Sequence, residues 1–202
     1  MNKLLSTTLV SLLCLCWASA DEDYDLRING DFRGAAVNAP QAPGWSVSPG
    51  EGSTRMIVGE DYDEFAIEVT AGARNGKTVA SDLQPVFGNA VKLETELKGN
   101  GVATIGIAAY GADRKPLFTR TRSYNATNWW STAKTVFSFP EPEVKFVQVI
   151  LSANPGSTIA FADVEAEFKR YATVPAQPQT QVPAQPVAQV PAQPVAQELP
   201  QT

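Results

Sequence analysis

The stretch Val91-Lys92-Leu93-Glu94-Thr95-Glu96-Leu97-Lys98 decides the fold class, because apolar or hydroxyl side chains alternate in it with charged ones. Successive side chains of a β-strand point to opposite faces of the sheet, so this pattern is typical of a half-buried strand. We predict that the odd-numbered positions are buried. The even-numbered positions are predicted to face outward.

The residues that follow predict further strands separated by turns. Gly99-Asn100-Gly101 accept positive φ, and the alternation resumes at Ile105, so we predict a hairpin here. A second hairpin is predicted to turn at 112–116. Later strands are expected at 135–139, 144–151 and 158–168, and no stretch shows a sustained helical period. The fold class is therefore predicted to be all-β, a jelly-roll β-sandwich.

Two similar acidic motifs bound this region. Asn29-Gly30-Asp31-Phe32 opens it and Phe161-Ala162-Asp163-Val164 nearly closes it. The segment 21–171 that contains both has the size of one ordinary domain. We therefore expect a single β-sandwich whose first and last strands carry these motifs.

The first twenty residues are predicted to be a secretory signal peptide. Lys3 precedes an apolar run over 9–17, and Ala18-Ser19-Ala20 supplies a small-residue cleavage site, so we expect cleavage after Ala20 and secretion. Cys14 and Cys16 both lie inside this segment, which leaves the exported chain without a disulfide. Lipidation of either cysteine is the alternative, and it is disfavoured because leucine precedes both.

Residues 172–202 are predicted to form a disordered tail rich in proline and glutamine. Val-Pro-Ala-Gln-Pro recurs at a period of eight, starting at Val174, Val182 and Val190. Proline fixes φ and removes a backbone donor, so an extended, polyproline-like arm is expected. One interpretation is a spacer, and the other is a segment that docks to an envelope layer or a protein partner.

Composition narrows the function classes. The chain contains no histidine, and it carries 16 basic against 21 acidic residues for a net charge of −5. An acidic chain without a basic run is a poor candidate for nucleic acid, and the signal is too short for membrane insertion. The exported part lacks the commonest general base, nucleophile and zinc ligands, so we do not expect an enzyme.

The order of several motifs resembles bacterial carbohydrate-binding modules of families four and nine, which have the galactose-binding-domain-like jelly roll. The chain shows Leu26 to Phe32, Ala42-Pro43-Gly44-Trp45, the strand and turn over 108–113, Trp129 or Trp130 leading into 135–140, and Ile159 to Val164. The resemblance covers nearly all of 21–171. It implies a jelly-roll fold and binding of a poly- or oligosaccharide.

The resemblance also implies a structural calcium ion near the terminal strands. Asp31 and Asp163 are the matching positions, and a hard cation would take carboxylate and carbonyl oxygens there. Arg33 and Ala162 replace acidic residues common in the family, so at most two carboxylates match. The alternative is that Asp31 caps a turn and Asp163 ends a strand.

Outward positions of the expected strands supply candidates for a sugar-binding face. Sugar binders combine exposed aromatic rings with polar side chains. Trp129 and Trp130 must point to opposite faces, whereas Trp45 is expected to plug the core. The candidate residues are Tyr110, Trp129, Trp130, Arg120, Glu94 and Gln148. The alternative for each is an ordinary solvated side chain.

Together these features predict a secreted, non-catalytic protein that binds carbohydrate on a concave sheet face. The alternative is a structural or adhesive protein of the cell surface or matrix that keeps the fold without sugar binding. The absence of a catalytic domain in this chain favours that alternative. A third possibility, an enzyme, would need an acidic pair that the strand order brings together.

Overall fold

The structure, a computed structural model, describes residues 24–60 and 64–171, and all their regular elements are strands. The predicted signal peptide and tail lie outside the described residues. The strands are β1 (Tyr24–Asp25), β2 (Trp45–Val47), β3 (Gly52–Val58), β4 (Phe65–Ala71), β5 (Lys77–Ser81), β6 (Gln84–Pro85), β7 (Ala90–Tyr110), β8 (Pro116–Ala126), β9 (Ser131–Ser138), β10 (Phe146–Ala153) and β11 (Thr158–Lys169). The predicted all-β class is confirmed, and the part that the structure describes holds no helix that could span a membrane.

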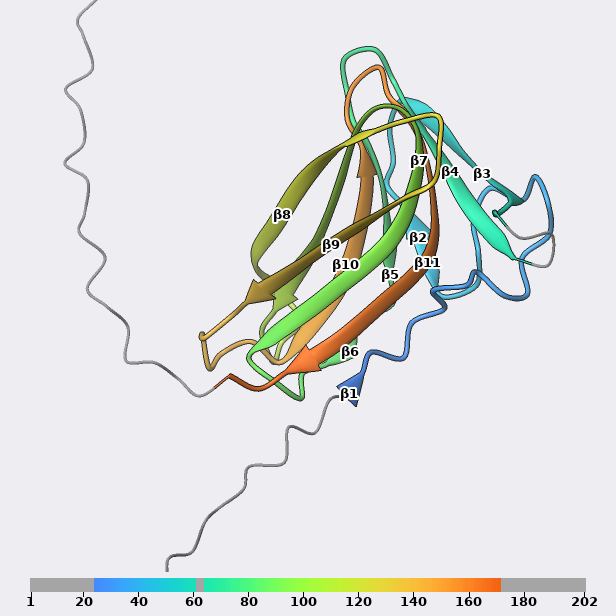
Figure 1. Cartoon of the computed structure of the whole chain (residues 1–202). Coiled ribbons are helices and arrows are strands. Elements are labelled where there is room, and N and C mark those ends of the chain that lie inside the picture. Colours follow the sequence, from blue (N-terminus) through green and yellow to red (C-terminus); the bar gives the residue numbers. More distant parts are fainter. Residues whose placement is uncertain (1–23, 61–63, 172–202) are drawn as a thin grey trace, which may run out of the picture. The chain divides into compact units, whose positions relative to one another are not determined.

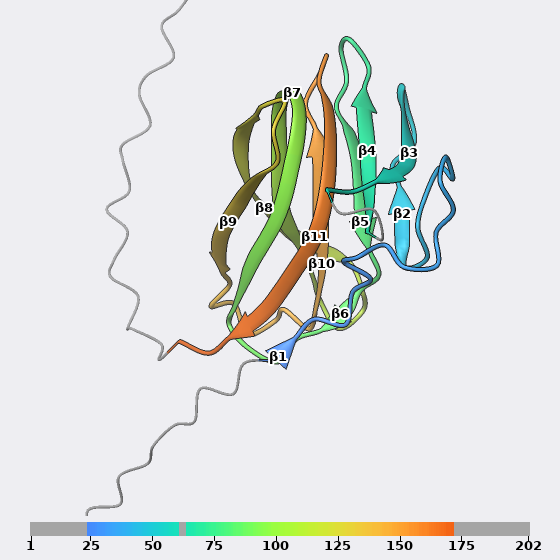
Figure 2. The same ribbon diagram turned by 45° about the vertical axis from the view of Figure 1, so that its right-hand side comes forward.

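The strands form two antiparallel sheets that pack face to face (Figures 1 and 2). Sheet A has the order β9-β7-β11-β4-β3, with β1 paired to the end of β11. Sheet B has the order β8-β7-β10-β5-β2, with β6 paired to β10. The core lies between them and is built from alternate residues of both, as a sandwich requires. Examples are Leu93, Ile107, Val149 and Phe161, all fully buried.

Strand β7 belongs to both sheets, and this corrects the predicted hairpin at Gly99-Asn100-Gly101. The chain does not reverse there. It continues as one strand of 21 residues, whose first half pairs with β9 and β11 and whose second half pairs with β8 and β10. Gly99 and Gly101 have φ of 151° and 106°, and a Cβ on Gly99 would overlap the carbonyl oxygen of Thr158. The glycines therefore allow a bend between sheets rather than a turn.

The alternation predicted for the first half of β7 is confirmed. Val91, Leu93, Thr95 and Leu97 are buried, and the charged residues between them face outward. The hairpin predicted at 112–116 is also confirmed, since β7 and β8 pair across it. Thr95 is the one hydroxyl in the buried row, and its Oγ1 donates to the carbonyl oxygen of Ala162 at 2.8 Å.

The two acidic motifs meet in space. The N–H of Val164 donates to the carbonyl oxygen of Gly30 at 3.2 Å, and Trp45 Nε1 donates to the carbonyl oxygen of Asn29 at 2.8 Å. The rings of Phe32 and Trp45 lie 5.3 Å apart and both are buried, so Trp45 plugs the core as predicted. Asp163 sits in a bulge within β11 with φ of 46°, rather than at a strand end.

Gly30 is the position in this contact that no other residue can occupy. A Cβ on Gly30 would overlap the backbone carbonyl of Val164, which cannot move without breaking β11. We expect Gly30→Ala to lower the free energy of unfolding by more than about 2 kcal/mol, measured by urea denaturation. Gly156→Ala is the matched control, because Gly156 has φ of 73° but nothing within 4 Å, so it should cost only about 1 kcal/mol. Equal losses in the two variants would contradict this account.

Candidate functional site

The outer face of sheet B carries no charged side chain on its strands. It is formed by alternate residues of β2, β5, β7, β8 and β10, whose registers place them side by side. We call it the uncharged face. Its residues are Ser46, Thr78, Ala80, Thr104, Gly106, Ala108, Tyr110, Thr119, Thr121, Ser123, Phe146, Gln148, Ile150 and Ser152.

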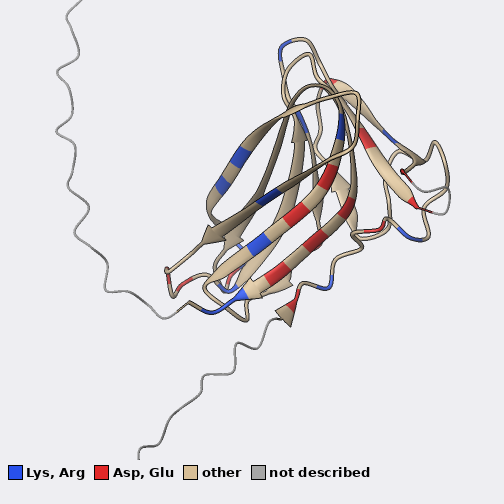
Figure 3. Ribbon diagram, in the orientation of Figure 1, with Lys and Arg blue, Asp and Glu red and all other residues tan. Residues whose placement is uncertain are grey.

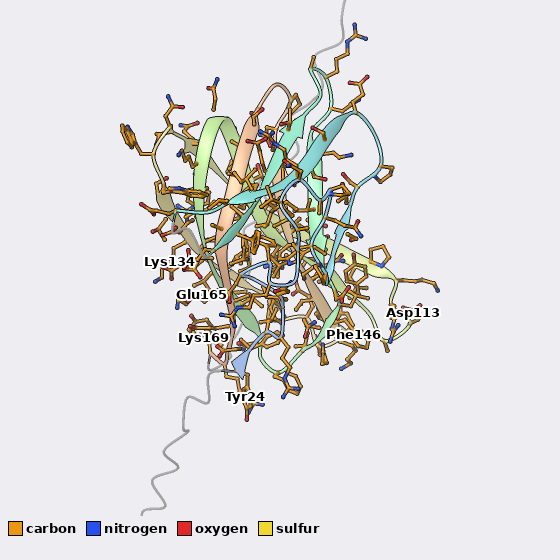
Figure 4. The ribbon with its side chains drawn as sticks, turned by 90° about the vertical axis from the view of Figure 1, so that its right-hand side faces the viewer. Tyr24, Asp113, Lys134, Phe146, Glu165 and Lys169 are labelled. Atoms are coloured by element: carbon orange, nitrogen blue, oxygen red, sulfur yellow. The ribbon has the colours of Figure 1, made fainter. Side chains whose placement is uncertain are left out.

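One end of the uncharged face is aromatic and has a fixed amide. The hydroxyl of Tyr110 donates to Gln148 Oε1 at 2.8 Å, and Gln148 Nε2 donates to the carbonyl oxygen of Ser81 at 2.5 Å. Phe146, labelled in Figure 4, lies opposite Tyr110 in the register. The Arg114 guanidinium stands 5.5 Å from the Phe146 ring. Both rings are half-buried. The two hydrogen bonds fix the positions of the Tyr110 and Gln148 side chains relative to each other.

The other end of the uncharged face is lined by hydroxyl groups that bond to one another. Thr104 Oγ1 lies 2.9 Å from Ser123 Oγ and donates to Asn154 Oδ1 at 3.0 Å. Thr78 Oγ1 and Ser152 Oγ are 2.8 Å apart. Between the two ends the floor is small and apolar, with Gly106, Ala108, Ala80 and Ile150. Such a surface suits a ligand with flat C–H patches bordered by hydroxyls.

The outer face of sheet A is charged instead (Figure 3). Glu94 lies 2.7 Å from Lys134 Nζ and 3.8 Å from Lys92 Nζ, and Glu167 lies 3.1 Å from Lys92 and 2.8 Å from Lys169. Hydrogen bonds from Lys169 and then Lys92 hold the pKa of Glu167 below its ordinary value of 4.5, despite partial desolvation. The predicted candidate Glu94 thus belongs to an ion-pair network.

Arg120 has its side chain on neither the uncharged face of sheet B nor the charged outer face of sheet A. It lies on β8 opposite the inward-facing Ile107, so its side chain lies at the edge of the sandwich, where β8 and β9 end the two sheets. Its guanidinium stands 4.7 Å from the Phe118 ring, lies 2.6 Å from Glu141 and donates to the carbonyl oxygen of Ser138. These contacts neutralise the charge of the guanidinium and fix the orientation of the side chain.

The two tryptophans lie in the connection between β8 and β9. Trp129 is 80% exposed, whereas Trp130 is half-buried with Lys98 Nζ 5.8 Å from its ring. Trp130 borders a hollow of about 260 Å³ beside Glu68 and Ala160. The six predicted residues therefore do not form one cleft. Tyr110 and Gln148 meet on sheet B, and Arg120 lies at the edge. Glu94 lies on sheet A, Trp130 packs beside that sheet from the connection, and Trp129 is exposed in the same connection.

The predicted calcium residues share one hollow. Asp31 and Asp163 both line a space of about 390 Å³, together with Arg33, Glu64 and Phe65. Arg33 Nη2 lies 2.7 Å from Asp31 Oδ2, so a fixed cation already neutralises that carboxylate. Calcium takes six to eight oxygen ligands, and the described residues form no cluster of three or more acidic, histidine or cysteine ligands. Asp31 and Asp163 alone supply fewer ligands than calcium takes, so backbone carbonyl oxygens or water would have to complete the set, and the ion stays a prediction.

Sequence reasoning missed Phe146 and the hydroxyl row. The period-two pattern that singled out Gln148 also places Phe146, Ile150 and Ser152 on the same face of β10. Thr104 lies on the same face of β7 as Tyr110. Its partner Ser123 required the β7–β8 register, which the sequence does not show.

Comparison of the fold with solved structures identifies similar domains. The family 11 carbohydrate-binding module of Clostridium thermocellum, in complex with a β-1,3-1,4-mixed-linked tetrasaccharide, matches with a TM-score of 0.52 and 14% identity, covering 72% of this chain and 96% of that one. The CBM22-1 xylan-binding domain of Paenibacillus barcinonensis Xyn10C matches with a TM-score of 0.54 and 10% identity, covering 76% and 100%. The fold is that of these carbohydrate-binding modules.

Similar folds also occur in other classes of protein. The Stig cyclase Fisc of Fischerella sp. TAU matches with a TM-score of 0.57 and 11% identity, covering 74% of this chain and 100% of that one. The chain spans only 19% of the matched tailspike protein 4 fragment of bacteriophage CBA120. No family model matches the sequence, and no curated protein is similar to it in sequence. The fold is thus shared by binding modules and enzymes.

The charged face of sheet A yields a pH-dependent prediction. Because the pKa of Glu167 is lower in the folded state, its ion pairs stabilise the fold above pH 4.5, and this contribution is lost as the pH falls through the folded-state pKa. Glu167→Gln should cost less than about 1 kcal/mol at pH 7, and the cost should shrink toward zero at lower pH. Urea unfolding at a series of pH values measures it. Glu165→Gln is the control, because Glu165 is exposed and has no ion pair within the described part of the chain. A cost that is constant down to pH 3 would contradict the assignment.

Proposed function

We propose that this protein binds a carbohydrate, without catalysis, through the uncharged face of sheet B. The observation that carries the proposal is the fixed pair of Tyr110 and Gln148 beside Phe146, at the end of a floor bordered by hydroxyls. An aromatic ring can lie against the C–H patch of a sugar ring, and hydroxyl and amide groups can bond the sugar hydroxyls. The fold shared with two carbohydrate-binding modules supports the proposal.

The other surfaces suit this role less well. On sheet A the outward charges are engaged with one another, so a neutral sugar would have to displace ion pairs. Glycoside hydrolysis requires two carboxyl groups placed across a cleft, whereas Glu94 and Glu167 lie on adjacent strands of one sheet face and contact lysines. Binding without catalysis therefore agrees better with the chemistry of the two faces.

The proposal is tested by retention of the full-length chain on affinity gels and on insoluble polysaccharides, with a panel of neutral glycans. Tyr110→Ala and Gln148→Ala should each reduce affinity for the retained glycan about tenfold or more, because each removes a fixed contact at the aromatic end. Glu94→Gln and Trp130→Ala are the matched controls on sheet A, and they should leave retention unchanged.

Two outcomes would overturn this proposal. Retention that is lost with Trp130→Ala but kept with Tyr110→Ala would move the site to sheet A. No retention on any glycan would leave the alternative of a structural or adhesive surface protein. Thermal unfolding of each variant shows whether a loss of binding reflects a loss of fold.

Export, a structural calcium ion and membership of families four and nine remain parts of the proposal. The first twenty residues support export and the motif order supports the families.

Calcium would stabilise the folded state by mass action, so the midpoint of thermal unfolding should rise with added calcium and fall with a chelator. Asp163→Asn should abolish that difference. Equal midpoints with calcium and chelator would exclude the ion.

A further inference from the structure

A second surface with binding character lies at the end of the sandwich where β1, β6 and the end of β11 come together (Figures 1 and 2). A hollow of about 690 Å³ there is lined by Tyr24, Leu26, Gln84, Pro85, Phe87 and Phe168, together with Asp25 and Arg27. We call it the aromatic hollow. It is formed by strands of both sheets, and none of its residues belongs to the uncharged face.

The rings of the aromatic hollow are held in a stepped arrangement. Tyr24 and Phe87 are stacked at 5.7 Å, and Phe87 meets the buried Phe168 edge-on at 5.9 Å. Arg170 stands 5.8 Å from the Tyr24 ring and its Nε donates to the carbonyl oxygen of Phe87 at 2.9 Å. Phe87 is nevertheless 49% exposed and Tyr24 is 37% exposed. Exposed aromatic rings in a fixed arrangement are typical of a binding surface.

Aromatic grooves of this kind suit polyproline chains. A polyproline II helix has three residues per turn, so prolines at i and i+3 lie on the same side and can enter the spaces between rings. It has no internal hydrogen bonds, so its carbonyl groups are free to accept from donors at the groove. Gln84 and Arg27 supply such donors beside the rings.

The same chain carries this kind of ligand. Each Val-Pro-Ala-Gln-Pro unit has prolines three residues apart, and the three units begin at Val174, Val182 and Val190. The first proline, Pro175, comes four residues after Tyr171, whose backbone N–H and carbonyl bond the side chain of Asn89, two residues from Phe87. The repeats are uncharged, which matches a hollow lined mainly by apolar side chains.

We propose that the aromatic hollow binds a proline-rich extended segment, and that its occupant is the Pro-Ala-Gln-Pro repeat of residues 174–194 of another copy of this chain. Three repeats spaced about 25 Å apart when extended allow one chain to engage more than one neighbour. Linked sites of this kind raise the overall strength of association without new contacts. The inference does not depend on sugar binding.

The test uses the full-length chain with all six repeat prolines replaced by serine, so that its own repeats do not compete. A fluorescent peptide of residues 173–194 is titrated with this protein, and its anisotropy is measured. We expect saturable binding, weakened about tenfold by Phe87→Ala and by Tyr24→Ala. Trp129→Ala, which removes an exposed ring elsewhere, should leave binding unchanged. A peptide with the same composition but without the i, i+3 proline spacing should not bind.

Sedimentation of the chain with its natural repeats completes the test. We expect association that grows with concentration and is lost with Phe87→Ala or with the serine-substituted repeats. No peptide binding, or binding unaffected by both aromatic substitutions, would overturn the site. A chain that stays monomeric at every concentration would overturn the second copy as the occupant. Thermal unfolding of each aromatic variant separates loss of binding from loss of fold.

Discussion

The structure depends on one strand being shared by both sheets. Within the described sandwich, β8, β9, β10 and β11 pair directly with β7. Every other strand is linked to β7 through one or two intervening strands. Gly99 and Gly101 allow β7 to bend, because side chains there would overlap Thr158 and Ser157. The bend sends Glu94 and Tyr110, which both point outward on the same strand, to opposite outsides of the sandwich. The charged face and the uncharged face are therefore two halves of one alternating pattern.

A second constraint is the contact between the loop after β1 and the bulge of β11. Gly30 and Val164 approach so closely that only glycine fits, and the bulge that brings Val164 there leaves the carbonyl of Ala162 facing the buried row of β7. Thr95 donates its hydroxyl to that carbonyl. A buried carbonyl without a partner would cost about 1–3 kcal/mol. The Thr95 hydroxyl avoids that cost by donating to the carbonyl oxygen beside the bulge of β11.

Alternation along the sequence was enough to separate buried from exposed positions, as in β7 and β10. It could not tell which sheet an outward residue belongs to, since that depends on pairing between distant strands. The predicted hairpin at Gly99 was wrong because glycines with positive φ occur both in turns and in bends. Only the pairing of β7 with distant strands distinguishes the two. Of the six candidate residues, only Tyr110 and Gln148 share a face and a hydrogen bond.

The aromatic side chains that reach the surface divide among surfaces with different chemistry. Tyr110 and Phe146 stand beside hydroxyl and amide groups, which suits a sugar, whereas Tyr24 and Phe87 stand beside proline and leucine, which suits an extended apolar chain. The two surfaces use different residues of the sandwich, and they adjoin where Pro85 of the aromatic hollow pairs with Phe146 of the uncharged face. A protein that associates through its repeats would then present many uncharged faces together, and weak binding of each to a repetitive glycan would add up to strong attachment.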